Sequence, residues 1–414
     1  MENLNMDEFE RAGNAIISPG FARDPYPFYA ALRRNDPVHW SDKWNCWILT
    51  RYDDVRECLS DFKNFSNRGR ITGLFDTYFS AEELTQLTPL IAHYSGGLIN
   101  VDPPDHTRMR KILHSVFRPS TIKKLEDRIV SYVSELLDEK QAGDCLRVVE
   151  ELAFPLPVKV IAEVFGVPPE DTGLFTKWST GIVEFMQQAQ PSLGVCLRSQ
   201  TKLLEMREYI KVAVADRRVN PKDDVLTLMV EAEEDGNRLT EEEILSTSVT
   251  ILIGGHETTT RLMATTILEL ERHPEQRAQL VENPDGMMVA VEEFLRFCGP
   301  FHRDQRVCKE DVVLRGKRIK KGQTVLLMLA AANRDPEAFE DAENFELSRK
   351  LNKHLAFGYG AHICLGSHLA RLEMAIVIRT LLERAPQYRL AEKDVEWDYG
   401  FLRGPKEVVI TFDP

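Results

Sequence analysis

The sequence predicts a mainly α-helical fold with small β-sheets. Apolar residues recur three and four positions apart over many segments, which is the pattern of helices that bury one face. Strand-like patterns are confined to two regions of the chain. Because no low-complexity linker, repeat or abrupt change of composition divides the 414 residues, we expect one domain over 1–414.

Several segments carry the helical pattern clearly. The longest of them contains a Gly-Gly pair, and another follows the last cysteine of the chain. A further helix is expected to open at 102–105, because proline favours the first turn of a helix. The helical pattern covers 123–140, 200–217, 240–272, 287–298 and 367–384.

The strand patterns are short and rich in valine, isoleucine, leucine and tryptophan. Arg315-Gly316 and Lys321-Gly322 supply turns between the later strands. We expect strands at 38–40, 46–49, 312–314, 318–319 and 325–328.

Composition excludes several classes of function. A hydrophobic fraction of 43% can supply a large core, and a net charge of −13 argues against a nucleic-acid partner. The first eight residues are acidic and polar, so we expect neither a signal peptide nor a membrane anchor. The seven cysteines are scattered, which agrees with a reducing compartment. We therefore expect a cytoplasmic protein with no membrane partner and no fused reductase.

One of these cysteines, Cys364, lies in a glycine-spaced loop just ahead of a helical pattern. Glycines at 358, 360 and 366 permit tight backbone turns, and the start of a helix favours the thiolate form of a nearby cysteine. A lone cysteine is more often a small buried hydrophobic residue. However, the chain has no Cys-x-x-Cys pair of the kind that binds zinc or iron–sulfur clusters, whereas haem iron can take a single axial thiolate.

The ten residues 357–366 read Phe-Gly-Tyr-Gly-Ala-His-Ile-Cys-Leu-Gly and resemble the haem-binding signature of the cytochromes P450. The resemblance implies the P450 fold, in which haem b lies between a distal helix (I) and a proximal helix (L). It also implies that Cys364 is the axial iron ligand. Phe357 and His362, in the same loop, are then expected to contact the haem.

A second motif, Gly-Gly-His-Glu-Thr-Thr at 254–259, interrupts the longest helical pattern. Glycines inside a helix are costly, so Gly254 and Gly255 either pack against a neighbouring helix or let a ligand approach the backbone. The motif resembles the distal helix of the cytochromes P450. By that resemblance the two glycines adjoin the haem, Thr258 hydrogen-bonds dioxygen and Glu257 relays protons. We assign no role to His256.

Two charged residues one helical turn apart form a third motif, Glu293 and Arg296. Such a pair is usually a weak surface contact. It resembles the Glu-x-x-Arg pair of the P450 K helix, and Arg349 matches the arginine that completes it. The resemblance implies a buried structural group that holds the cysteine loop.

The resemblance also implies partners for the haem propionates. His106 and Arg110 are four residues apart on one face of the helix that opens near 102, whereas Arg108 points away from that face. Arg306 and His362 match two further propionate contacts. Arg108 and Lys111 are expected on the surface, either simply solvated or as a docking patch for an acidic ferredoxin.

The sequence indicates the substrate pocket less specifically than it indicates the haem site. Its candidate residues lie in stretches that vary within the family, and most are apolar, which favours a small, largely apolar organic substrate. The candidates are Leu74, Phe75, Phe185, Phe301, Phe401 and Leu402.

Taken together, the motifs predict a haem-thiolate monooxygenase. It would insert one oxygen atom from dioxygen into its substrate by hydroxylation or epoxidation. Electrons would come from a separate ferredoxin and an NAD(P)H-dependent ferredoxin reductase. Two alternatives stay open: a peroxide-driven peroxygenase, and a haem-binding sensor without turnover.

Overall fold

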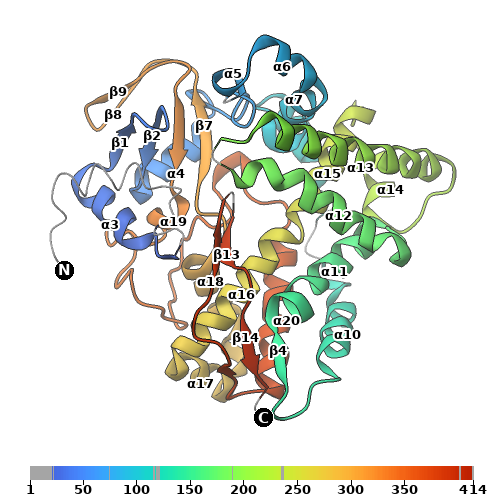
Figure 1. The fold of residues 1–414 in the computed structure, drawn as a ribbon, viewed down its shortest axis with the longest axis vertical. Coiled ribbons are helices and arrows are strands. Elements are labelled where there is room, and N and C mark those ends of the chain that lie inside the picture. Colours follow the sequence, from blue (N-terminus) through green and yellow to red (C-terminus); the bar gives the residue numbers. More distant parts are fainter. Residues whose placement is uncertain are drawn as a thin grey trace. The chain divides into compact units, whose positions relative to one another are not determined.

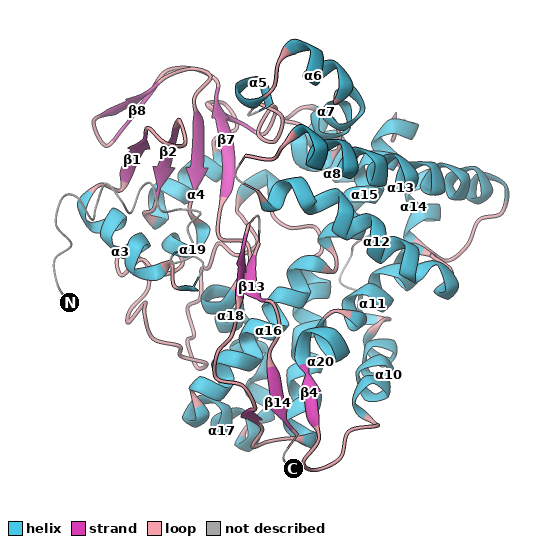
Figure 2. Cartoon of the chain, viewed as in Figure 1, coloured by secondary structure: helices cyan, strands magenta, loops and turns pink. Residues whose placement is uncertain are grey.

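Helices make up most of the chain, as the sequence predicts (Figure 2). The computed structural model describes residues 21, 23–73, 75–114, 117, 122–188, 190–234, 237–400 and 402–412. Two compact units can be separated. The first comprises 1–65, 126–156 and 258–414, and the second comprises 66–125 and 157–257. The expectation of a single domain stays a prediction.

Helix α20 of the first unit follows directly after the cysteine loop. The α18 and α20 helices pack against each other, and α20 also contacts α10. The helices of this unit are α3 (Tyr26–Asn35), α4 (Tyr52–Ser60), α10 (Glu126–Leu137), α16 (Glu257–Arg272), α17 (Pro274–Glu282), α18 (Met287–Cys298), α19 (Leu329–Ala332) and α20 (Ser367–Arg384), with shorter turns η2 (Val148–Ala153), η5 (Pro284–Gly286) and η6 (Gly360–His362).

The main sheet has five strands in the order β1-β2-β10-β7-β3. Strand β10 pairs in parallel with β2, with Val325 opposite Trp47, and antiparallel with β7, with Val325 opposite Arg306. The five strands are β1 (Val38–Ser41), β2 (Cys46–Leu49), β10 (Thr324–Leu327), β7 (Asp304–Cys308) and β3 (Phe65–Ser66).

Smaller sheets complete the first unit. Strands β4 (Cys145–Arg147) and β14 (Val409–Thr411) run side by side near the C-terminus (Figure 1). The remaining strands are β8 (Val312–Leu314), β9 (Lys317–Ile319), β11 (Arg389–Leu390), β12 (Trp397–Tyr399) and β13 (Arg403–Pro405). All five predicted strands are confirmed, but the expectation that strands occur in only two regions is wrong, because within this unit β3, β4, β7 and β11 to β14 lie elsewhere.

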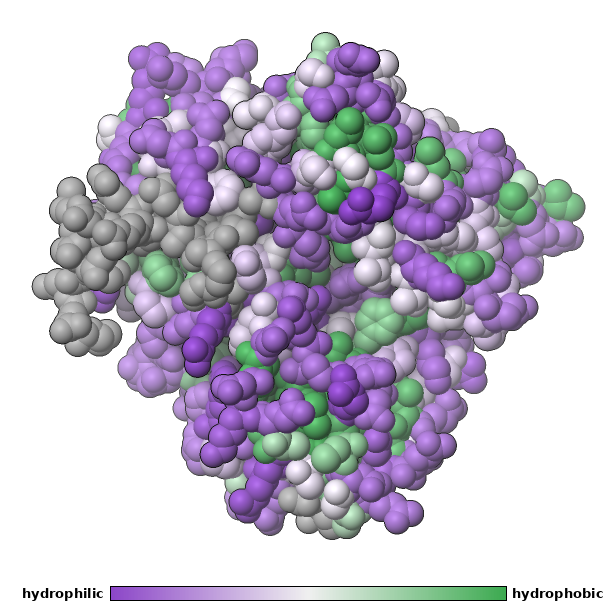
Figure 3. All heavy atoms as spheres, viewed as in Figure 1, coloured by the Kyte–Doolittle hydropathy of each residue, from purple (hydrophilic) through white to green (hydrophobic). Residues whose placement is uncertain are grey.

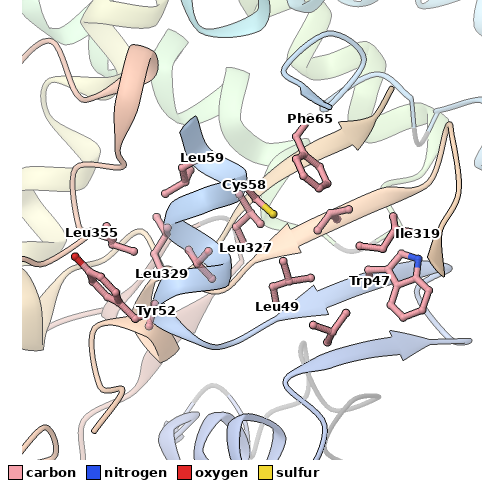
Figure 4. Packing of buried hydrophobic residues seen from close by; sticks show 14 of the residues in the cluster. Trp47, Leu49, Tyr52, Cys58, Leu59, Phe65, Ile319, Leu327, Leu329 and Leu355 are labelled. Carbon is pink, nitrogen blue, oxygen red and sulfur yellow. The ribbon is translucent and has the colours of Figure 1, made fainter. Parts of the chain in front are cut away.

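A hydrophobic cluster joins α4 to the main sheet. Cys58 of α4 points toward the sheet, near Phe65 and Leu327 (Figure 4). Tyr359 of the cysteine loop packs against the same cluster. The described side chains on the face drawn in Figure 3 are mostly hydrophilic. No helix among the described residues is long and apolar enough to cross a membrane.

The second unit is almost entirely helical. Its helices are α5 (Phe75–Tyr78), α6 (Ala81–Gln86), α7 (Thr88–Ser95), α8 (Asp105–His114), α11 (Pro155–Phe165), α12 (Thr172–Val183), α13 (Leu193–Val219), α14 (Val225–Glu231) and α15 (Glu241–Gly254), with turns η1 (Leu98–Asn100), η3 (Pro169–Asp171) and η4 (Glu184–Gln187) and the two-stranded β5 (Glu233–Glu234) and β6 (Asn237–Arg238).

The predicted helical segment 240–272 is divided into α15 and α16. It begins with a capping box, in which the Thr240 hydroxyl accepts the Glu243 N–H and the Glu243 carboxylate accepts the Thr240 N–H. The two helices are separated at Gly255 and His256. Among the described helices α13, with 27 residues, is the longest, so the expectation that 240–272 holds the longest helix is wrong.

Candidate active site

The cysteine loop presents Cys364 at the surface of the first unit. Five of the seven cysteines are buried, and Cys364 is one of the two exposed ones. Its N–H donates to the Phe357 carbonyl over 2.9 Å, which closes the loop. Gly360 has a φ of +74°, and a Cβ there would lie 3.1 Å from the Ser60 Cα of α4. Glycine is therefore required for both the turn and the close approach to α4.

The cysteine loop is also supported by a group of charged residues that the sequence motifs did not reveal. Glu292 on α18 accepts hydrogen bonds from Arg371 on α20 (Oε1 to Nε, 2.6 Å) and contacts His354 Nε2 at 3.1 Å. The Arg371 guanidinium also lies 4.7 Å from the centre of the Phe357 ring. Burial would raise the pKa of the Glu292 carboxyl, but the bonds from Arg371 and His354 outweigh it and lower this pKa to about 2. The carboxylate is thus ionised and fixes the Phe357 end of the loop.

The structure brings Glu293, Arg296 and Arg349 together. Glu293 Oε1 and Oε2 accept from Arg296 Nη2 and Nε over 2.6 and 2.8 Å. Arg349 Nε donates to Glu293 Oε2 over 3.2 Å. Arg296 also donates to the carbonyls of Asn333, Ala342 and Asn344. These bonds tie the segment before the cysteine loop to α18.

Gly254 and Gly255 differ in what surrounds them. A Cβ on Gly255 would lie 2.8 Å from the Ile161 side chain of α11, so this glycine allows two helices to pack closely. A Cβ on Gly254 would meet no atom within 4 Å, and Gly254 is exposed. The packing interpretation therefore applies at Gly255, whereas the approach of a ligand to Gly254 stays a prediction.

Glu257 and Thr258 follow this pair at the start of α16. The side chain of Glu257 is 13% exposed, and its expected role as a proton relay stays a prediction. Thr258 is half-buried. An acid and a hydroxyl therefore stand next to each other at the point where the helix is interrupted.

His256, to which the sequence analysis gave no role, is buried beside Glu257. Its Nε2 lies 3.6 Å from Glu257 Oε1 and 3.1 Å from the Ser179 hydroxyl on α12. Only the position of the histidine beside the acid could have drawn attention to it, because Ser179 is 77 residues away.

The four expected propionate contacts divide between the two units. His106 and Arg110 belong to α8 in the second unit, and Arg306 and His362 belong to the first. Burial and the charge of Arg110 lower the pKa of His106 to about 4, so this ring is neutral and carries one N–H donor.

Arg306 tests whether the site suits an anionic cofactor. The residue is 1% exposed, and its Nη1 donates to Asp304 Oδ2 and to the Gln305 carbonyl over 2.7 and 2.8 Å. Its buried Nη2 has no hydrogen-bond partner among the described residues. A buried guanidinium N–H needs an acceptor. A propionate of a bound haem would supply one, so the residues present fit that group.

The expected surface role of Arg108 needs correction. Its guanidinium forms an ion pair with Glu243 of α15 and donates to the Arg238 carbonyl. Only 29% of this side chain is exposed. Lys111 is exposed on α8. Arg108 thus joins two elements of the second unit instead of standing in solvent.

The candidate pocket residues that the structure describes belong to both units, and their role stays a prediction. Phe75 and Phe185 are buried in the second unit, with ring centres 5.9 Å apart, and Tyr94 adds a third ring 5.5 Å from Phe185. In the first unit Phe301 packs against the α4 cluster and Leu402 is buried. Leu74 and Phe401 lie outside the described residues.

Comparison with known proteins decides the family. The family model described as Cytochrome P450 matches residues 47–408. The chain belongs to the cytochrome P450 family. Members of the family are monooxygenases that use haem b, and both statements hold for this P450.

Individual relatives match along nearly the whole chain. Cytochrome P450 CYP107DY1 of Priestia megaterium is 34% identical over 416 residues, which is 100% of both chains. The crystal structure of P450BioI in complex with hexadec-9Z-enoic acid ligated acyl carrier protein has a TM-score of 0.87 at 34% identity, covering 96% of this chain and 100% of that one. CYP109E1 from Bacillus megaterium in complex with testosterone has a TM-score of 0.85 at 33% identity, covering 96% and 100%.

Proposed function

We propose that this P450 inserts one oxygen atom from dioxygen into a C–H or C=C bond of a small, largely apolar molecule. Electrons come from a separate ferredoxin and its NAD(P)H-dependent reductase. The observation that carries this proposal is the Glu257–Thr258 pair at the interruption between α15 and α16. Reduction of dioxygen takes two protons from solvent, whereas hydrogen peroxide already carries the protons that its cleavage requires, so a path for protons from solvent favours dioxygen as the oxidant.

Each residue has a distinct task in this proposal. Haem bound through Cys364 supplies the iron at which dioxygen is reduced. Glu257 takes protons from solvent and passes them inward, since its side chain is partly exposed. The Thr258 hydroxyl can accept one hydrogen bond and donate another, so it can pass a proton onward from Glu257. Glu293, Arg296 and Arg349 hold the segment that precedes the thiolate loop.

Cofactor binding is assigned to residues around these groups. Arg306, His362, His106 and Arg110 would bind the propionates, and the open space at Gly254 would admit the porphyrin. Phe357, which Arg371 holds in place, would also contact the haem.

The docking of the ferredoxin is proposed at the exposed end of α8, where Lys111 presents a positive charge. Arg108 is left out of this surface because it is paired with Glu243. The protein carries a net charge of −13, so a local positive charge is needed to attract an acidic partner.

The proposed substrate is a free apolar molecule of lipid or steroid type. The support is the buried aromatic group of Phe75, Tyr94 and Phe185, and the testosterone complex of the related CYP109E1. An acyl chain on a carrier protein is the competing substrate class, suggested by the P450BioI complex. A spin-state titration with free fatty acids, steroids and terpenoids, and with acyl carrier protein bearing a fatty acid, separates the two classes.

Turnover tests the reaction class. The haem-loaded protein is mixed with surrogate ferredoxin, reductase, NADPH, isotopically labelled dioxygen and any ligand that shifts the spin state. We expect a product with one labelled oxygen atom. Equal product formation from hydrogen peroxide alone, without the redox partners, would instead support a peroxygenase. Absence of product with every spin-shifting ligand would support a sensor.

A further inference from the structure

His256 has a defined protonation pattern. Its Nδ1 lies 2.8 Å from the Leu252 carbonyl, one turn earlier in α15. A carbonyl oxygen can only accept, so Nδ1 carries a hydrogen. The exchangeable position is therefore Nε2, which faces both Ser179 and Glu257.

Ser179 can serve either protonation state of Nε2. Its single hydroxyl hydrogen has two acceptors in reach, the Thr176 carbonyl at 3.1 Å and His256 Nε2 at 3.1 Å. When Nε2 is bare, the hydroxyl donates to it. When Nε2 carries a hydrogen, the hydroxyl rotates to Thr176 and its oxygen accepts from the ring. Both states leave the buried ring fully hydrogen-bonded.

The small cavity beside the ring is lined, among the described residues, by side chains that do not titrate at neutral pH, apart from His256 itself. His256 is 3% exposed and Ser179 is 1% exposed. They border a cavity of about 10 Å³, whose other described lining residues are Val158, Ile161, Ala162, Phe175, Thr176, Met206 and Leu252. None of these carries a titratable side chain. A titratable group does lie close to Nε2, since Glu257 Oε1 is 3.6 Å away.

We propose that His256 is a proton store for Glu257, with the Ser179 hydroxyl as its switch. Insertion of one oxygen atom from dioxygen reduces the other atom to water and consumes two protons and two electrons. Glu257 holds one proton at a time. In the transfer, the Nε2–H bond of the imidazolium breaks and a bond to Glu257 Oε1 forms, so the ion pair becomes two neutral groups. The store is refilled through Glu257 from solvent.

This inference rests on the proposed function of Glu257, and the variants separate the two. His256→Asn keeps a donor for Leu252, and His256→Gln keeps a partner for Ser179, but neither holds a second proton. Ser179→Ala removes the switch. Ser199→Ala is the matched control, because Ser199 is also buried and its hydroxyl bonds only to the Gly181 carbonyl among the described contacts.

With redox partners and a spin-shifting ligand, we expect Asn or Gln at position 256 to lower product formation about tenfold and to divert electrons to hydrogen peroxide. Glu257→Gln should do the same, and Ser199→Ala should not. A normal product-to-peroxide ratio in both His256 variants, while Glu257→Gln is impaired, overturns the proton store. A normal ratio in Glu257→Gln itself overturns the proposed function of Glu257.

A measurement without turnover checks the geometry. In the reduced carbonyl-bound protein, ¹⁵N-histidine labelling and comparison with His256→Asn identify the His256 ring. The neutral ring should carry its hydrogen on Nδ1, and Ser179→Ala should shift the Nε2 signal. A neutral ring protonated on Nε2, or an Nε2 signal unaffected by Ser179→Ala, contradicts the proposal.

Discussion

Glu293 and Arg296, one turn apart on α18, form a two-bonded ion pair in which both side chains are completely buried. Removing one partner would leave a buried charge without compensation. Glu293→Gln should therefore lower the free energy of unfolding by about 3–5 kcal/mol. It should also reduce haem content, because Arg349 loses its carboxylate partner. Urea unfolding and the haem-to-protein ratio measure the two effects.

Glu310 and Lys321 provide the control for that variant. Their pair is also close, at 3.0 Å, but both side chains are about two-thirds exposed (68% and 67%). Glu310→Gln should change stability by less than about 1 kcal/mol and leave haem content normal. Similar losses of stability and haem content in Glu293→Gln and Glu310→Gln would show that burial does not determine the contribution of the α18 pair.

The two adjacent glycines should respond oppositely to alanine. Gly255→Ala places a methyl group 2.8 Å from Ile161 and should destabilise the protein by about 1–3 kcal/mol. Gly254→Ala meets no protein atom and should stabilise the helix by up to about 1 kcal/mol. However, the added methyl group should weaken haem binding. Thermal unfolding of the haem-free chains measures stability, and haem titration measures haem binding. Haem binding equal to wild type in Gly254→Ala would contradict the expected effect of the added methyl group.

Stability should fall with rising pH because of Glu373. This α20 residue is 1% exposed, neither carboxyl oxygen has a partner among the described residues, and burial raises its pKa from 4.5 to about 8. Above pH 4.5 the unfolded chain releases this proton and the folded chain retains it. Stability should therefore decrease by a few kcal/mol between pH 4.5 and 8.

Glu373→Gln should remove that decrease and leave the protein more stable than wild type at pH 8. Glu383→Gln, at an exposed position on the same helix, should keep it. The measurement is the urea midpoint of all three proteins from pH 5 to 8.5. An unchanged pH slope in Glu373→Gln would mean that Glu373 is ionised in the folded protein.

Lys111 and Arg108 should behave differently although both belong to α8. Lys111→Glu should slow reduction by ferredoxin, and the difference should shrink at high salt, because exposed charges are screened. Arg108→Glu should lower stability, because it faces Glu243 with a like charge. Stopped-flow reduction at two salt concentrations measures the first effect. Equal reduction rates in Lys111→Glu and wild type would move the docking surface elsewhere.

The motifs could be predicted from the sequence because their residues are only a few positions apart along the chain. Glu293 and Arg296 share a helix face three residues apart, and the strands at 46–49 and 312–314 are rich in apolar residues. Strand β7 was missed because Asp304–Cys308 is mainly polar and becomes a strand through its pairing with β10. Arg306, buried in that strand, also interrupts the hydrophobic pattern.

Contacts between distant segments could not be predicted in this way. Glu292 and Arg371 are 79 residues apart, and His256 and Ser179 are 77 apart. Nothing in either local pattern connects them. The position of Arg108 failed for the same reason, since helical geometry gave its direction on α8 but not its neighbour, Glu243, 135 residues further along the chain.

Thiolate ligation by Cys364 is the central claim, and the reduced carbonyl complex tests it most directly. Wild type and Cys145→Ala, which alters the other exposed cysteine, should both show the far-red-shifted Soret band of thiolate-bound haem. Cys364→Ala should lose that band. A thiolate-type Soret band in Cys364→Ala, or its loss in Cys145→Ala, would contradict the account.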